Sequence, residues 1–373
     1  MDCSRSTSRP SSVAESEFEV PYGMVFASDQ LAPSPLPSAR GEVSEQLIAL
    51  LQSEPKEELV IPTQLPGGDP LTGEDAALSL YCLYELHYRG WKGVSDQWEW
   101  HPGLLGFRSK LEAALEQRLA EVVGPLPESV ALPDDLEALL ENAGGPSLSD
   151  YLLEKGTTEQ FQESAIHRSA WQLKEADPYT WAIPRLFGKP KAAAVEIQAD
   201  EYGAGAERDM HQTLFAVTLE ELGLNPTYHA YINELPGYTL AGVNVISLFG
   251  LHRRWLGACV GHLAAFEMTS VAPMGKNSAA LRRLGFGSDA QHFYDVHVVA
   301  DAHHQNVAAG DLASGLVEQR PDLAMDVLFG AKSVCALEAH ASKRMIEDWE
   351  AGRSSLLGEI SKDRADLSVS SDR

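Results

Sequence analysis

The chain of 373 residues is poor in cysteine and in basic residues. Its cysteines are scattered without a CxxC spacing, which argues against a zinc–thiolate site and favours a reduced, cytoplasmic protein. These four residues are Cys3, Cys82, Cys259 and Cys335. Lysine and arginine number 29 against 54 acidic residues, which gives a formal net charge of −25. A surface of this sign repels nucleic acids and anionic membranes, so neither is an expected partner.

Long apolar runs and strand-like alternation are also scarce. The sequence has no run of about 18 apolar residues, the length that a membrane-spanning helix requires. The first residues contain no apolar core of the kind found in secretory signals. Alternation of apolar and polar residues with a period of two, which indicates half-buried strands, is rare. We therefore expect an all-α protein, and a hydrophobic content of 44% is sufficient for a buried core.

Composition and helical periodicity divide the chain into four regions. The first region is rich in serine, proline and charged residues, and the second contains short amphipathic stretches. The third contains longer helical patterns that are typical of a bundle. The expected regions are a disordered or loosely attached tail at 1–42, an N-terminal helical arm at 43–146, a helical bundle at 147–355 and a flexible tail at 356–373. Within the bundle we expect long helices over about 191–222, over about 240–270 with a kink or break, and over about 288–309.

The third of these helices contains the stretch YDVHVVADAHHQ, which is dense in possible metal ligands. Successive helical residues turn by about 100°, so Asp301 lies about 40° and His304 about 20° from the direction of His297. The three side chains therefore share one face. Two imidazoles and a carboxylate suit iron, zinc or manganese, and a buried hydrogen-bonded polar cluster is the alternative. His292 and His303 point roughly 120° to 140° away and are expected on the surface.

Further possible ligands stand alone inside apolar helical stretches. Glu267 lies in LAAFEMTSV and His211 in DMHQTLFAVTL. An unpaired buried charge is costly, so such residues require partners. Each alone is equally well explained as a hydrogen-bonded core residue, whereas together they favour a metal site between helices. The E-x-x-H motif that is usual in ferritin-like diiron bundles does not occur.

Four segments resemble the haem-oxygenase-like diiron oxidases, also called the iron-containing redox enzyme family. These segments are KEADPYTWAIPRL, EIQADEYGAGAERDMHQTLF, AFEMTS and FYDVHVVADAHHQ. The resemblance covers residues 170–310 and is strongest to the N-oxygenating branch, typified by the central domain of an N-nitrosating enzyme. It implies a haem-oxygenase-like helical bundle preceded by a dimerising arm. It also implies seven metal ligands, which fall here on Glu175, Glu201, His211, Glu267, His297, Asp301 and His304.

One of the seven, Glu201, does not fit the geometry of a continuous helix. Relative to His211 it points about 80° away, whereas Asp200 and Glu207 lie within about 40°. Helical spacing alone therefore favours Asp200 or Glu207, with Glu196 as a further substitute. The resemblance favours Glu201, and a distortion at the glycines of DEYGAG would remove the conflict.

The resemblance implies an oxygen-dependent, non-haem diiron N-oxygenase. It would use two Fe(II) ions, O2 as co-substrate and an external electron donor or reductase. The expected reaction converts an amine nitrogen to a hydroxylamine, nitroso or nitro group in natural-product biosynthesis. Candidate substrates are lysine or arginine derivatives and heteroaromatic amines such as 2-aminoimidazole. The alternatives are a diiron desaturase or C–C-cleaving oxidase of an amino or fatty acid, and a non-catalytic metal-binding or helical partner protein.

Four aromatic residues close to the expected ligands are candidates for the substrate pocket, although aromatic side chains beside a bundle core are more often packing residues. They are Trp181, Tyr202, Phe215 and Tyr294. No feature indicates a haem pocket, and a carboxylate-rich ligand set is not how haem iron is held.

Overall fold

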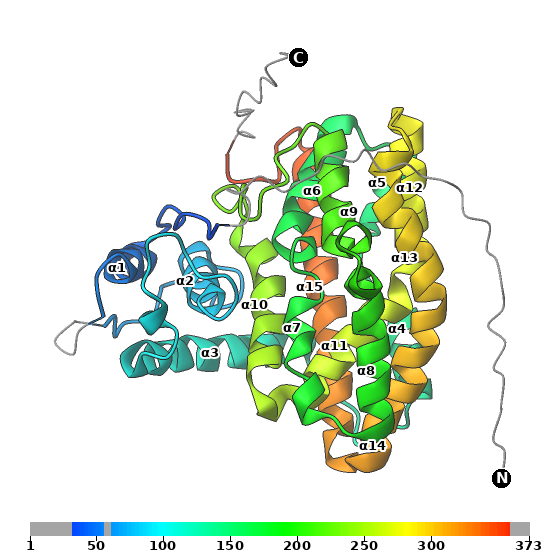
Figure 1. Ribbon diagram of the computed structural model, residues 1–373, viewed down its shortest axis with the longest axis horizontal. Helices are drawn as coiled ribbons and strands as arrows, with labels where there is room; N and C mark the ends of the chain where they lie inside the picture. The colour runs from blue at the N-terminus through cyan, green and yellow to red at the C-terminus, as the bar shows by residue number, and fades with distance from the viewer. Residues whose placement is uncertain (1–31, 56–60, 359–373) are drawn as a thin grey trace, which may run out of the picture. The chain divides into compact units, whose positions relative to one another are not determined.

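A computed structural model describes residues 32–55 and 61–358. Within these ranges every regular element is helical and no strand is formed (Figure 1). The predicted all-α fold is therefore confirmed. Residues 1–31 of the expected N-terminal tail, and the expected C-terminal tail beyond residue 358, lie outside the described residues. None of the helices in the described part combines the length and the apolar character needed to cross a membrane.

Four helices precede residue 147, in the region expected to form the arm. They are α1 (Glu42–Leu51), α2 (Glu74–Glu85), α3 (Pro102–Val123) and α4 (Asp134–Glu141). Figure 1 shows α1, α2 and α3 on one side of α10, and α2 packs directly against α10. Every residue of α2 from Ala76 to Glu85 is buried, because α1, α3 and α10 surround it. This arm is therefore packed onto the bundle through a fully enclosed helix.

The helices of the bundle follow from residue 148 onward. They are α5 (Leu148–Glu154), α6 (Thr158–Gln172), α7 (Asp177–Thr180), α8 (Gly188–Glu201), α9 (His211–Glu221), α10 (Gly237–Leu251), α11 (Leu256–Thr269), α12 (Val271–Leu284), α13 (Ser288–Asn306), the π-helical η6 (Val307–Ser314), α14 (Gly315–Gln319) and α15 (Ala324–Glu350). Helices α11 and α15 run side by side through the interior, and α13 packs against α9, α11 and α12.

Two glycines allow α11 and α15 to approach each other at backbone distance. A Cβ atom on Gly261 would lie 1.8 Å from the carbonyl oxygen of Val327, and one on Gly330 would lie 2.0 Å from that of Ala258. No side chain fits at these separations, so the pair can pack this closely only with glycine at both positions. This contact fixes α11, which carries Glu267, within the core.

The helix expected over 191–222 is broken in the structure, and the expectation of one continuous helix was wrong. Helix α8 ends at Glu201 and α9 begins at His211. Between them Gly203 and Ala204 have left-handed backbone angles, with φ of 60° and 51°. A continuous right-handed helix cannot include such residues, so the chain turns a corner here. The break expected within 240–270 is confirmed and lies at His252, between α10 and α11.

Candidate metal centre

The structure brings the seven expected ligands together from several elements. Glu175 lies in the turn between α6 and α7, Glu201 ends α8 and His211 begins α9. Glu267 lies near the end of α11, and α13 contributes His297, Asp301 and His304. The complete set, all buried except the partly exposed Glu175, is Glu175, Glu201, His211, Glu267, His297, Asp301 and His304.

The donor atoms form two groups that share one residue. In the first group one donor atom from each of four residues lies within 4.8 Å of the others. Its members are Glu175, Glu201, His211 and His297. The second group satisfies the same criterion and consists of Glu201, Glu267 and His304. Asp301 lies beside the second group, with Oδ1 3.7 Å from His304 Nδ1. The arrangement is that of two adjacent metal positions with Glu201 between them.

Five of these side chains have a buried polar atom without a hydrogen-bond partner. The atoms are Glu201 Oε2, His211 Nδ1, Glu267 Oε2, His297 Nε2 and His304 Nδ1. Each such atom costs about 1–3 kcal/mol if it stays unsatisfied. Glu201 Oε2 and His211 Nδ1 are 2.9 Å apart without the geometry of a hydrogen bond. Bound cations would satisfy all five atoms, so the donor set fits metal ions held by imidazole and carboxylate.

The outer nitrogen of two histidines is already used, which orients the other nitrogen toward the donor groups. His297 Nδ1 lies 2.7 Å from the carbonyl oxygen of Phe293, so Nε2 faces Glu175 Oε1 at 3.6 Å. His304 Nε2 lies 2.9 Å from Asp200 Oδ2, so Nδ1 points inward. Outer partners of this kind fix the tautomer and ring orientation of metal-binding histidines. Each ring is therefore oriented to present its inner nitrogen to the centre.

The structure also distinguishes Glu201 from the other acidic residues considered as the seventh ligand. Its side chain is 8% exposed and faces His211. Asp200 is half-exposed and contacts the outer side of His304, while Glu207 is exposed. Glu196 pairs on the surface with His303, Oε1 to Nε2 at 2.9 Å. The corner between α8 and α9 removes the conflict of helical phase, and Glu201 alone of the four acidic residues reaches the centre.

Comparison with known proteins shows what part of the chain resembles. Residues 162–339 match the model of a family described as iron-containing redox enzyme. All seven expected ligands fall within these residues. The matched stretch is similar to this haem-oxygenase-like, iron-containing redox family. This match agrees with the oxidoreductase that the sequence predicted.

A curated relative supports the same family. Nitrosourea synthase from Streptomyces achromogenes subsp. streptozoticus is 29% identical over 152 residues. The aligned part covers 40% of this chain and 32% of the relative. The chain therefore spans about a third of the length of that curated protein.

The pKa values of the candidate ligands reflect burial and the charges of the neighbouring carboxylates and histidines. Burial raises the pKa of Glu201 to about 7 and that of Glu267 to about 8. Burial alone would lower the pKa of His297, but the facing carboxylates, chiefly that of Glu175, raise it to about 10. Burial and the adjacent His297 lower the pKa of His211 to about 4. The centre without metal therefore holds protons at neutral pH, and cations bind in exchange for them.

A cavity of about 370 Å³ reaches the candidate ligands. Five ligands line it, as do the aromatic side chains of Trp171, Phe266 and Phe293. The five are Glu175, Glu201, Glu267, His297 and Asp301. Of the four aromatic candidates for the pocket, Phe215 and Tyr294 line the cavity. The Tyr202 hydroxyl instead donates to Asp177 Oδ1, and Trp181 packs against Tyr88.

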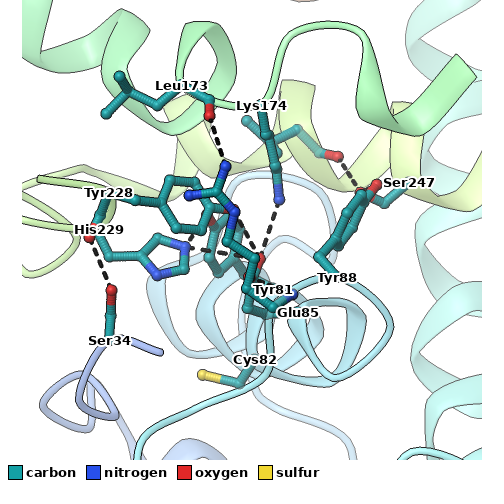
Figure 2. Close-up of polar contacts among 12 residues, drawn as sticks. Ser34, Tyr81, Cys82, Glu85, Tyr88, Leu173, Lys174, Tyr228, His229 and Ser247 are labelled. Atoms are coloured by element: carbon teal, nitrogen blue, oxygen red, sulfur yellow. Dashed lines mark hydrogen bonds and ion pairs between the residues drawn. The ribbon is translucent and has the colours of Figure 1, made fainter. Parts of the chain in front are cut away.

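A buried ionic network includes Lys174, the sequence neighbour of Glu175, and was not predicted (Figure 2). Lys174 Nζ lies 3.2 Å from Glu85 Oε2, and both side chains are almost fully buried. The Tyr228 hydroxyl donates to the same oxygen at 2.9 Å, and the ring of Tyr88 lies 4.0 Å from Lys174 Nζ. The network ties α2 to the turn that carries Glu175. Its signal in the sequence is a glutamate within the apolar stretch YCLYELHY.

Other residues that position the ligands were also missed. With its amide nitrogen turned toward Glu175, Gln172 donates to Glu175 Oε2 at 3.1 Å. The Ser270 hydroxyl donates to Asp301 Oδ2. Gln172 lies three residues before Glu175, whereas Ser270 and Asp301 are distant in the sequence and only the three-dimensional contact joins them.

Proposed function

We propose that the protein is an oxygen-dependent, non-haem diiron N-oxygenase that oxidises an amine nitrogen of a small molecule. The observation that carries this proposal is the pair of donor groups that share Glu201 and open onto one cavity. A carboxylate between two metal positions is the arrangement that holds two irons close together. The name of the relative, nitrosourea synthase, describes a product with a nitrogen–oxygen bond, which supports nitrogen over carbon as the site of oxidation.

Each iron would have its own set of ligands. The first would be held by Glu175, His211 and His297, the second by Glu267, Asp301 and His304, and Glu201 would be shared. Two bound Fe(II) ions would supply electrons for the reduction of O2. Gln172 and Ser270 orient two of the carboxylates, and the aromatic wall of the cavity restricts water beside the amine.

The reaction balances only with an external electron donor. Forming a hydroxylamine from an amine inserts one oxygen atom of O2 into an N–H bond. The second atom leaves as water, which consumes two electrons and two protons. We therefore infer a separate reductant, and further rounds would lead to the nitroso or nitro level. We also propose that the protein forms a homodimer through residues 43–146, which light scattering would test. We further propose that the reaction belongs to natural-product biosynthesis.

The direct test loads the protein with Fe(II) under anaerobic conditions and adds O2 with a panel of amines. We expect O2 consumption that depends on one class of amine, and a product whose mass has increased by an oxygen atom. Loss of two hydrogen atoms, or a shortened carbon chain, would instead establish the desaturase or C–C-cleaving reaction. A lack of O2 uptake with every amine and acid tested would favour a non-catalytic protein.

Iron content tests the ligand assignment separately. We expect His297→Ala and Asp301→Ala to lose one or both irons, because each removes an inward-facing donor from α13. His303→Ala is the matched control on the same helix, since its ring is 65% exposed and pairs with Glu196 on the surface. Iron per chain and helical circular dichroism are the measurements. Two retained irons in either of the first two variants would contradict the assignment.

A further inference from the structure

The cavity contains one ion pair that the candidate metal centre does not use. Among the described side chains that line it, outside the seven ligands, Arg168 on α6 is the single cation and Glu338 on α15 the single anion. Arg168 Nη1 donates to Glu338 Oε1 at 3.0 Å, and Nη2 donates to Oε2. The two side chains are 35% and 37% exposed. Because both side chains remain partly exposed, separating them costs less than separating a fully buried pair.

The ion pair and a candidate ligand lie along one wall of the cavity. Arg168, Trp171 and Gln172 on α6 have the spacing i, i+3 and i+4 and line the cavity, as does Glu175 in the turn after α6. From Arg168 to Gln172 the helix rises by about 6 Å, and Glu175 lies beyond its end. A molecule bound to the ion pair therefore has to be extended to reach the donor groups.

A third polar group in the cavity lacks a partner. Asn277 on α12 lines the cavity, and its buried Oδ1 accepts no hydrogen bond. A buried carbonyl oxygen without a donor is costly, so a ligand with an N–H group would satisfy it. This observation is independent of the ion pair and indicates a nitrogen-bearing ligand.

We propose that Arg168 and Glu338 bind the head group of an α-amino acid substrate of the N-oxygenase. The guanidinium of Arg168 accommodates the carboxylate as a bidentate pair, and Glu338 takes the α-ammonium group. The side chain then extends along the cavity and carries its terminal nitrogen to the iron ligands. Lysine and arginine are the common amino acids whose side chains carry a nitrogen farthest from the head group.

The ion pair distinguishes this substrate class from the others considered. A fatty acid would engage Arg168 and leave Glu338 beside an apolar chain without a cation. A heteroaromatic amine without a carboxylate would use neither charge for recognition. Only a zwitterionic head group satisfies both charges at once, as burial of an unpaired charge is unfavourable. The role in catalysis rests on the proposed function, whereas binding can be measured without it.

Binding to the iron-loaded, anaerobic protein is tested by calorimetry with three matched probes. L-Arginine has the complete head group, agmatine lacks the carboxylate and Nα-acetyl-L-arginine lacks the ammonium group. The same comparison is made with L-lysine, cadaverine and Nα-acetyl-L-lysine. We expect at least one of the two amino acids to bind, and each of its analogues to bind at least about tenfold more weakly, as expected for loss of a charge-assisted hydrogen-bonded pair.

Variants assign each loss to one residue. Arg168→Gln should weaken the amino acid to the level of its decarboxylated analogue and leave that analogue unchanged; Arg168→Lys should restore part of the affinity. Glu338→Gln should weaken the amino acid to the level of its acetylated analogue. The double variant, R168Q with E338Q, has no unpaired charge and should fold while binding neither form tightly. Arg320→Gln, in an exposed pair with Asp322, is the control.

The outcomes separate this inference from the proposed function. Failure of both amino acids to bind, or an equal loss of amino acid and decarboxylated analogue in Arg168→Gln, would overturn the inference. If an amino acid binds through Arg168 but is not oxidised, the head-group site stands and the N-oxygenase proposal fails. If amines without a carboxylate are oxidised and bind equally well, the N-oxygenase stands and the head-group site fails.

Discussion

At the scale of single residues, the candidate centre depends on which side of each group is already occupied. His304 contacts Asp200 through Nε2, and its Nδ1 faces the interior. His297 contacts the carbonyl oxygen of Phe293 through Nδ1, and its Nε2 faces the interior. Asp200 and Glu201 are neighbours in sequence, yet the first supports a histidine from outside and the second faces inward. Substitutions at these two adjacent carboxylates should therefore have different consequences.

We expect Glu201→Gln to lose at least one iron, because its carboxylate belongs to both donor groups. Asp200→Asn should keep both irons but bind one of them roughly tenfold more weakly, as is typical when a partner outside the ligand shell is changed. Metal titration and iron content per chain measure the difference. A greater loss of iron in Asp200→Asn than in Glu201→Gln would make Asp200 the ligand instead.

At the scale of elements, the corner between α8 and α9 decides whether Glu201 and His211 meet. Gly203 has a φ of 60°, and a Cβ atom there would lie 2.5 Å from the carbonyl carbon of Asp209. The corner thus depends on a residue without a side chain as well as on its left-handed backbone.

Gly203→Ala should disturb this corner and reduce iron binding. Gly205→Ala is the matched control, because Gly205 also has a positive φ, of 89°, but nothing lies within 4 Å of its Cβ position. Both variants incur the left-handed backbone cost of about 1–2 kcal/mol, and only the first adds a steric clash. Thermal unfolding and iron content compare them; equal effects would show that the close approach at Gly203 is unimportant.

The contrast between α13 and the α8–α9 corner shows what the sequence could predict. The face formed by His297, Asp301 and His304 was predictable, because α13 is regular over these residues and local spacing fixes their directions. Glu201 could not be placed from spacing, because the left-handed angles at Gly203 and Ala204 interrupt the helical period. Contacts between distant segments, such as Arg168 with Glu338, have no local signal at all.

The turn that carries Glu175 depends on the pair formed by Glu85 and Lys174. Lys174→Met should destabilise the protein by about 3–5 kcal/mol, because it leaves the buried Glu85 carboxylate without its cation. The double variant, E85Q with K174M, should recover much of that loss. Urea denaturation measures both, and Lys155→Met, in an exposed pair with Glu350, should leave the midpoint nearly unchanged. If the double variant is as unstable as Lys174→Met, the buried charge is not the cause.

At the scale of the whole molecule, two buried histidines make stability depend on pH. Burial lowers the pKa of His262 to about 3, and burial together with Arg168 does the same for His167. The unfolded chain binds these protons below the ordinary pKa of 6.5, while the folded chain binds them only near 3. Stability present at neutral pH is therefore lost as the pH falls from 6.5 toward 3, by about 1.4 kcal/mol per pH unit for each histidine.

We expect His262→Gln to show a smaller loss of unfolding free energy between pH 7 and pH 5 than the unmodified protein does. The measurement is urea denaturation at both pH values with a chelator present, so that iron release does not contribute. His303→Ala is the control, because this histidine lies on the surface and not in the core. An unchanged slope in His262→Gln would mean that this histidine is not kept neutral by the fold.

Residues 143–146, which precede the bundle, line the same cavity as the candidate ligands, and the Cβ position of Gly145 lies against Ala339 of α15. The stretch that matches the family begins only at residue 162. A gene rearrangement that transferred this stretch alone would carry every expected iron ligand but leave one wall of the substrate space behind, together with Glu85. When this scaffold evolves to accept new substrates, we therefore expect the preceding helices and the matched stretch to be inherited together.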